Sequence, residues 1–351
     1  MINFAEFQDQ LQAERRTVSF DSYDITVRQL VDMFSDAELD IYPDYQRQFL
    51  WEEERQSQLI ESVFLGIPIP SIYMATNADA TWDVVDGVQR LCTLINYCGQ
   101  DKDRERIRKI VPLKLVGLEK LSELNESSFS ELPKSIQLHF LTRPIKVTVL
   151  NDKSDNDVRF DLFERLNTGG VSLTQQEIRN CIFQGKFNEF LKQQANKPLV
   201  KAVVKLKTSD ESNGTAEEFI LRFFAFLDNY SDFDHSVKHF LNDYMKSLID
   251  TGPSKNARSL FMDTFTLLKE CLPTGIVRGN RSITPVNLYE AIAVGTALAI
   301  RELGGTDELR KEIFPTLLED KKLRRFTTGA TNSRKMVVGR IEYVRNALLE
   351  T

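Results

Sequence analysis

The sequence lacks the features that place many chains in a membrane, in a secretory pathway or around a metal. It contains no run of about 18 apolar residues, the length that a membrane-spanning helix needs. Its first residues have neither the basic nor the apolar region of a signal peptide. Its four cysteines show no paired spacing, which argues against both a disulfide and a zinc site. We therefore expect a cytoplasmic protein with reduced thiols.

Signatures of common nucleases and nucleotide-binding enzymes are also missing. There is no Walker A glycine loop and no His-Asn-His nuclease pattern. His235 and His239 lie on one predicted helix face, but no glutamate in zincin order and no neighbouring cysteine accompanies them, so a metal pair is not favoured. The net charge of −6 argues against a protein coated by nucleic acid.

The pattern of apolar residues changes along the chain and predicts an α+β protein. The first half alternates strands with helices, whereas nearly every segment after about residue 155 has helical periodicity. We expect a mixed domain over 1–185 and an all-helical domain over 186–351. In the first domain we predict strands over 18–25, 71–75, 81–85, 113–116 and 144–150, helices over 2–15, 26–34 and 51–66, and a charged surface loop over 100–112.

The most informative stretch is a strand that runs into a polar turn and then into a helix. The apolar run 82–85 is followed by Asp86 and Gly87, and the amphipathic helix that follows carries Gln89 and Arg90 in its first turn. The free amides at a helix start bind anions, and a glycine lets a phosphate approach the backbone closely. This pattern is typical of a phosphate-binding turn.

The same residues also fit an explanation that needs no ligand. Asp86 and Gln89 have the spacing of a capping box, in which each side chain satisfies a backbone amide. Arg90 favours the ligand site, because a cation in the first turn of a helix costs roughly 0.3–1 kcal/mol unless an anion lies there.

Two further polar clusters interrupt otherwise apolar structure. Tyr45, Gln46 and Arg47 end an extended segment that begins beside a proline. The run 167–170 (Asn-Thr-Gly-Gly) ends a predicted helix, which is typical of a C-cap and also of a loop that contacts phosphate. Neither cluster identifies a ligand by itself.

Positive charge gathers near the end of the chain. From residue 321 to residue 345 there are eight basic side chains against Glu342 alone, an imbalance of eight minus one, or +7. Such segregation indicates either a surface for a phosphate backbone or a solvated helical face. The candidate nucleic-acid-binding residues are Lys321, Lys322, Arg324, Arg325, Arg334 and Lys335.

Taken in order, four of these motifs resemble a known family. The chain is similar, over about residues 20–185, to the N-terminal domain of GmrSD-type, modification-dependent (type IV) restriction proteins, which has a ParB/sulfiredoxin-like fold. The motifs are Tyr45-Gln46-Arg47, Ile67-Pro68-Ile69-Pro70, Asp86-Gly87-Val88-Gln89-Arg90 and Arg165-Leu166-Asn167-Thr168-Gly169-Gly170.

The resemblance implies a nucleotide-dependent bacterial defence or DNA-processing protein that binds or hydrolyses a nucleoside triphosphate with Mg²⁺. It implies catalytic roles for Asp86, Gln89 and Arg90, with Asp86 on the metal or orienting a water. DNA, a partner nuclease subunit and a second copy of the chain are the partners implied, and no membrane is. The implied nucleotide-binding residues are Tyr45, Gln46, Arg47, Gly87, Arg165, Asn167, Thr168 and Gly169.

The chain departs from the family in two respects, which leave its activity open. Val88 stands where the family motif Asp-Gly-Gln-Gln-Arg has its first glutamine, and the His-Asn-His domain of many members is missing. One alternative is therefore a non-catalytic sensor of a nucleotide or of modified DNA. Another is a DNA nickase or endonuclease that uses the same pocket, and a purely structural partner protein is a third.

Overall fold

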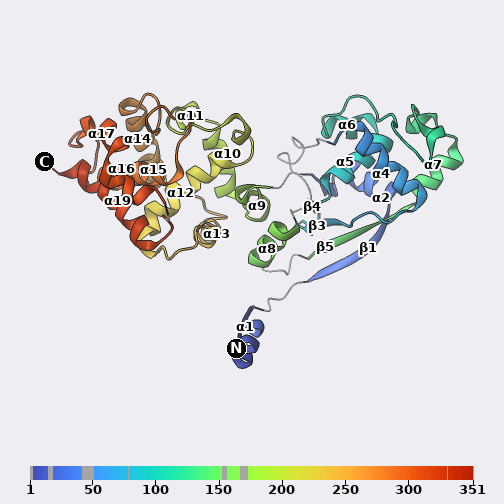
Figure 1. The fold of residues 1–351 in the computed structure, drawn as a ribbon, viewed down its shortest axis with the longest axis horizontal. Coiled ribbons are helices and arrows are strands. Elements are labelled where there is room, and N and C mark those ends of the chain that lie inside the picture. The colour runs from blue at the N-terminus through green and yellow to red at the C-terminus, as the bar shows by residue number, and fades with distance from the viewer. Residues whose placement is uncertain are drawn as a thin grey trace. The chain divides into compact units, whose positions relative to one another are not determined.

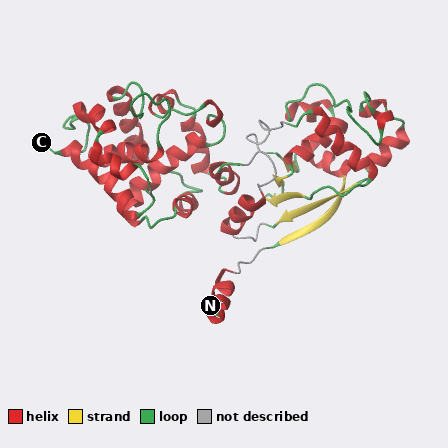
Figure 2. Cartoon of the chain, in the orientation of Figure 1, coloured by secondary structure: helices red, strands yellow, loops and turns green. Residues whose placement is uncertain are grey.

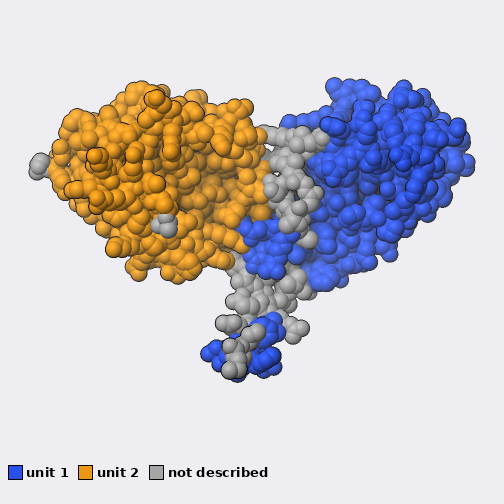
Figure 3. Space-filling view, viewed as in Figure 1, with its two compact units in different colours: residues 1–172 blue, residues 173–351 orange. Residues whose placement is uncertain are grey.

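A computed structural model describes residues 3–14, 19–41, 51–77, 79–151, 156–166, 173–329 and 331–350. The chain divides into two compact units, Met1–Ser172 and Leu173–Thr351 (Figure 3). The first unit contains a sheet with helices around it, and the second is built of helices (Figure 2). The predicted α+β class, with a mixed part followed by a helical part, is confirmed. Within the described residues, no helix has the length and apolar character needed to span a bilayer.

The first unit is organised around a five-stranded sheet in the order β1-β5-β3-β4-β2 (Figure 1). The β1/β5 and β3/β4 pairs are antiparallel, and the β5/β3 and β4/β2 pairs are parallel. Its elements are α1 (Phe4–Glu14), β1 (Phe20–Thr26), α2 (Val27–Ser35), β2 (Leu39–Asp40), α4 (Glu53–Leu65), β3 (Ile72–Thr76), β4 (Trp82–Asp86), α5 (Val88–Cys98), α6 (Asp101–Arg106), η1 (Ser122–Leu124), η2 (Phe129–Glu131), α7 (Lys134–Leu141), β5 (Pro144–Leu150) and α8 (Asn156–Leu166).

Burial of one helix explains where the polar turn lies. Leu91, Leu94 and Ile95 of α5 are fully buried, as the predicted apolar stripe requires. Helix α5 contacts β3, α2 and α4, and α8 contacts β4. Val84 and Val85 of β4 are also buried, so the strand is fixed in the core up to the residue before Asp86. The core therefore fixes the two elements that flank the turn.

Three predictions for the first unit are wrong. The charged stretch expected as a loop contains α6, because Gln100 and Asp103 form a capping box. Residues 113–116 are not a strand, although Leu115 is buried, because its amide bonds to Ser127 and its carbonyl accepts from Glu126 in an irregular loop. The first helix forms at α1, but its apolar side chains do not pack on the body: Phe4, Phe7 and Leu11 are exposed.

The second unit is made of helices. They are α9 (Gln175–Ile182), α10 (Lys186–Ala195), α11 (Pro198–Val203), η3 (Thr208–Asp210), α12 (Thr215–Asn229), η4 (Tyr230–Asp232), α13 (Val237–Ser247), α14 (Lys255–Cys271), α15 (Val286–Tyr289), the π-helical η5 (Glu290–Val294), α16 (Gly295–Leu303), η6 (Lys311–Ile313), α17 (Phe314–Glu319), α18 (Lys321–Thr327) and α19 (Arg334–Leu349). Thr174 and Glu177 form the capping box predicted at the start of α9.

The division between the units differs from the expected boundary at residue 185. Helix α9 lies before that residue but packs with the helical unit, because Arg179 is fully buried there. Its guanidinium donates to Glu218 of α12 at 3.0 Å and to Asn242 of α13 at 2.8 Å. A buried charge needs such partners, so α9 is held in the second unit.

A buried chain of ion pairs crosses this unit. Arg179 and Arg222 both pair with Glu218, and Arg222 also donates to Glu290 at 2.6 Å. The other carboxylate oxygen of Glu290 accepts from Arg340, and both of these side chains are fully buried. Burial alone would raise the pKa of Glu218, but Arg222 and Arg179 outweigh it and hold that pKa below its usual 4.5. Helices α9, α12, η5 and α19 are thereby tied together.

Candidate functional site

The predicted strand–turn–helix is present, and Gly87 forms the turn between the strand and the helix. Strand β4 ends at Asp86, and α5 begins at Val88 with Gly87 as its N-cap, at φ 100° and ψ 12°. This positive φ is a conformation that glycine adopts readily and that other residues rarely adopt. A Cβ at this position would also lie 3.0 Å from Nη2 of Arg90 and 3.2 Å from Cγ1 of Ile72. The turn therefore requires glycine for its backbone and for its packing.

The capping-box explanation of this turn is wrong. Helix α5 has no side-chain cap hydrogen bond. Asp86 is still part of the sheet, opposite Tyr73 of β3, so it is one residue too early to cap the helix. The Asp86 carboxylate instead accepts a hydrogen bond of 2.9 Å from Nη2 of Arg90.

Arg90 has an anion beside it, but one that the protein itself supplies. Its Nη2 donates to Asp86 and, at 3.1 Å, to the carbonyl oxygen of Ser71. These bonds offset the unfavourable helix dipole without a ligand, which the sequence did not predict. The Nε of Arg90 is nevertheless buried and has no hydrogen-bond partner among the described residues. A buried donor in that state costs about 1–3 kcal/mol.

An Nε without a partner is not unique to Arg90. Arg104, Arg143, Arg159 and Arg340 also have one in the described part of the chain. Among these arginines, only Arg90 follows an N-cap glycine with positive φ at the start of a helix. An unsatisfied donor and a helix start, where amides favour anions, therefore coincide at this residue.

Gln89 contacts the backbone that leads to another predicted cluster. Its Oε1 accepts from the backbone amide of Trp51 at 3.2 Å. The Trp51 carbonyl in turn accepts from Gln56 at 2.7 Å, and Gln56 accepts from Asn96 of α5 at 2.9 Å. This chain of hydrogen bonds holds Trp51 against α5.

Several predicted site residues cannot be placed. Tyr45, Gln46 and Arg47 lie outside the described residues, as do Asn167, Thr168 and Gly169. Arg165 is described, and it is exposed on α8, the helix that contacts β4. The structure thus brings Asp86, Gly87, Gln89 and Arg90 together, and their predicted roles stay predictions.

The described residues do not form a ready Mg²⁺ site. Asp86 is paired with Arg90, and no group of three or more histidine, cysteine, aspartate or glutamate side chains gathers in the described segments. Mg²⁺ is often held by one or two carboxylates together with substrate phosphates. Asp86 could supply one such ligand to an ion that arrives with a nucleotide, and the other ligands would come from phosphates and water.

The six basic residues singled out in the second unit are all exposed, on α18 and the first turn of α19. The two helices pack against each other. The +7 imbalance overstates the surface charge, however, because Arg340 is buried against Glu290. Burial, and to a lesser extent the neighbouring Arg324, lower the pKa of the Arg278 guanidinium, whereas Glu319 and Asp320 act in the opposite direction.

Substitution of Gly87 should separate backbone strain from the geometry of the site. We expect Gly87→Ala to cost about 1–2 kcal/mol from its positive φ and also to displace the Arg90 guanidinium. Gly304→Ala is the matched control, because Gly304 has φ 73° and open space around it. Chemical denaturation should show that Gly87→Ala loses at least as much stability as the control, because only its Cβ meets close neighbours, and only Gly87→Ala should weaken nucleotide binding. Equal binding by both variants would show that no ligand approaches Gly87.

The fold and this site define a class of protein. It is a mixed α+β domain in which a glycine turn begins a helix, and a carboxylate before the turn pairs with a guanidinium in the first turn of that helix. Residues 30–184 match the family model described as GmrSD restriction endonuclease, N-terminal domain. This part of the chain is similar to the N-terminal domain of GmrSD-type restriction proteins, and the predicted family resemblance is confirmed over these residues.

Two other comparisons add little. A solved structure of a Pnob8-like ParB-N domain is similar at 12% sequence identity and a TM-score of 0.23, with 94% of this chain and 96% of that chain covered. At that TM-score the likeness carries no argument. The comparison with curated proteins gives no match.

Proposed function

We propose that the protein is a restriction-type defence protein that binds the phosphates of a nucleoside triphosphate at the start of α5. The family model supports the restriction context. The observation that carries the nucleotide site is the buried, unsatisfied Nε of Arg90 beside the N-cap glycine. A phosphate oxygen would supply the partner that this donor lacks, at a helix end that favours anions.

The residues around the turn suggest distinct roles in hydrolysis. Asp86 and the Ser71 carbonyl hold the guanidinium of Arg90, which would stabilise charge on the transferred phosphoryl group. Asp86 would also orient a water that attacks the terminal phosphorus, breaking its bond to the bridging oxygen and releasing phosphate and a nucleoside diphosphate. Gln89 would position Trp51.

Melting experiments with a panel of nucleoside triphosphates and Mg²⁺ test this proposal. A ligand at 100 times its dissociation constant should stabilise the protein by about 2.7 kcal/mol. Release of phosphate would then identify a nucleotidase. If no nucleotide raises the melting temperature, the proposal is wrong.

A sensor that binds without hydrolysis is the second candidate. The pairing of Asp86 with Arg90 favours it, because a carboxylate that already accepts a hydrogen bond from a guanidinium is less free to orient an attacking water. Saturable stabilisation without phosphate release would support the sensor. Nicking of supercoiled plasmid by the purified chain, lost in Asp86→Ala, would instead indicate a nuclease that uses the same residues.

We also propose that the exposed basic residues of α18 and α19 contact a DNA backbone. If they do, affinity for DNA should fall with salt at a log–log slope of about −0.9 per phosphate neutralised. Replacing Lys321, Lys322, Arg324 and Arg325 by glutamine should flatten that slope by about one unit for each phosphate that is no longer neutralised, alike for all DNA sequences. Binding isotherms at several salt concentrations would measure it.

The matched control replaces four exposed lysines elsewhere in the same unit, namely Lys186, Lys201, Lys255 and Lys269. This variant loses the same number of charges and should keep the original slope. If both variants change the slope equally, or if the intact chain does not bind DNA, α18 and α19 simply present a solvated face.

A further inference from the structure

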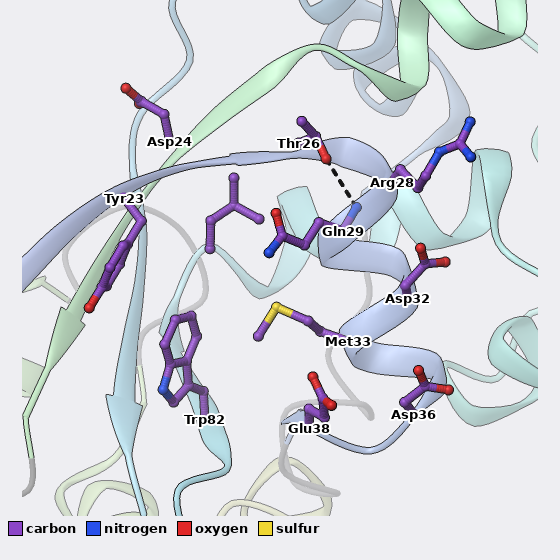
Figure 4. A pocket seen from close by; sticks show the side chains of 11 residues that line it. Tyr23, Asp24, Thr26, Arg28, Gln29, Asp32, Met33, Asp36, Glu38 and Trp82 are labelled. Atoms are coloured by element: carbon purple, nitrogen blue, oxygen red, sulfur yellow. Dashed lines mark hydrogen bonds between the residues drawn. The ribbon is translucent and has the colours of Figure 1, made fainter.

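A cavity of about 600 Å³ lies in the first unit between β1, α2 and the first residue of β4 (Figure 4). It is lined by Tyr23, Asp24, Ile25, Thr26, Arg28, Gln29, Asp32, Met33, Asp36, Glu38 and Trp82. None of the residues from Asp86 to Arg90 lines it, so it is separate from the proposed nucleotide site. A cavity of this size can hold a side chain or a small molecule.

Two stacked rings form one wall of this cavity. The ring centroids of Tyr23 and Trp82 are 5.7 Å apart, with an angle of 28° between the ring planes. Strands β5 and β3 separate their two strands in the sheet order, so the rings meet over the sheet and not between neighbouring strands. Tyr23 is 42% exposed, which leaves aromatic surface free for a ligand.

Side chains of α2 face the rings across the cavity. Gln29 and Met33 point toward the ring pair, and Glu38, which follows α2, lines the same cavity near Met33 (Figure 4). Gln29 lies in the first turn of α2, where its backbone N–H donates to the side-chain hydroxyl of Thr26 at 3.2 Å. Flat aromatic surface opposite one carboxylate and one amide is a recognition arrangement.

The charge around the cavity indicates the sign of the charge on its ligand. Asp24, Asp32, Asp36 and Glu38 are exposed, and none of them forms an ion pair within the described part of the chain. Arg28 is the one basic residue of the lining, so the lining carries four negative charges and one positive charge, a net of −3. Such a field repels phosphate and attracts cations, which excludes a nucleotide here.

We infer that this cavity binds the guanidinium group of an arginine side chain on a partner protein. A guanidinium is flat, so it stacks on a ring of the Tyr23–Trp82 pair while its fork of N–H donors engages the Glu38 carboxylate. The partner is a protein segment because β1 is an edge strand of the sheet. Tyr23, Asp24 and Ile25 of β1 line the cavity, so an extended chain that pairs with this strand would pass close to it.

Blocked pentapeptides that differ at one position test this inference on the full chain. The probe is Gly-Gly-Arg-Gly-Gly, and its control carries citrulline, which keeps the shape of arginine without the charge. The indole N–H resonance of Trp82 reports binding. We expect the arginine peptide to shift this resonance saturably. The citrulline peptide should bind about tenfold more weakly, or not at all.

Substitutions locate the effect. Glu38→Gln and Tyr23→Leu, both at exposed positions, should each weaken the arginine peptide about tenfold, whereas Asp263→Asn, in a separate cavity of the helical unit, should not. Equal binding of the two peptides, or an equal loss in the Asp263 variant, would each overturn the inference. These outcomes leave the proposed nucleotide site untouched.

Discussion

Replacing Glu290 by glutamine is expected to lower the free energy of unfolding of the helical unit by about 3–5 kcal/mol. Glu290 is fully buried and accepts from Arg222 and Arg340, of which Arg340 is also fully buried. The amide keeps the shape of the side chain but removes its charge. Two guanidinium groups would then share a site that the remaining carboxylate, Glu218, reaches only through Arg222.

The matched control is Glu319→Gln. Glu319 pairs with Arg324 at 3.4 Å, and both side chains are about half exposed. Exposed pairs contribute about 0–1 kcal/mol, so this variant should unfold almost as the original protein does. Denaturant titrations of the three proteins would compare them, and a loss in Glu290→Gln no larger than in the control would show that the buried network does not stabilise the unit.

The same network should make the helical unit sensitive to acid. The pKa of Glu218 is lowered in the folded protein, because the attraction of Arg222 and Arg179 exceeds the effect of burial. A depressed carboxyl pKa adds stability above the unfolded value of 4.5, and that stability is lost as the pH falls through the folded value. Glu218→Gln should therefore flatten the pH dependence of unfolding below pH 4.5.

Replacing Arg90 by alanine is expected to abolish stabilisation by nucleotide. The original protein should gain about 2.7 kcal/mol at 100 times the dissociation constant, and Arg90→Ala should gain none. Without nucleotide, the variant loses two hydrogen bonds of Arg90 but also its unsatisfied Nε, so its stability should change by about 1 kcal/mol or less. Thermal melts with and without nucleotide measure both quantities.

Arg143→Ala is the control for this variant. Arg143 also has a buried Nε without a partner among the described residues, and it donates to the carbonyl of Phe64 at 2.7 Å. It does not lie at a helix start after a glycine, so its loss should leave nucleotide stabilisation intact. A collapse of stability in ligand-free Arg90→Ala would assign Arg90 a structural role instead.

Local patterns predicted much of the fold. The strand at 144–150, the turn at Gly87 and the capping box at Thr174 follow from neighbouring residues, and each is present. The wrong predictions concern segments whose structure depends on contacts with residues distant in the sequence. The buried Leu115 reads as strand but bonds to an irregular loop, and the apolar face of α1 reads as core but is exposed.

The candidate sites show the same division. Asp86, Gly87 and Arg90 are adjacent in sequence, so their proximity could be predicted, but the bond from Arg90 to Ser71 depends on how β3 meets α5. The cavity beside Tyr23 and Trp82 was not predicted at all, because the two rings lie far apart in the sequence and meet only through the sheet order. The spacing of residues along the sequence does not predict such a contact.

The most direct test of the nucleotide site is the Nε–H resonance of Arg90 during titration with a nucleoside triphosphate. We expect this resonance and the backbone amides of Gly87 and Val88 to shift together and to saturate. The corresponding nucleoside, which lacks phosphate, should leave them unchanged. Saturable shifts that appear elsewhere while Arg90 stays unchanged would contradict a phosphate site at the start of α5.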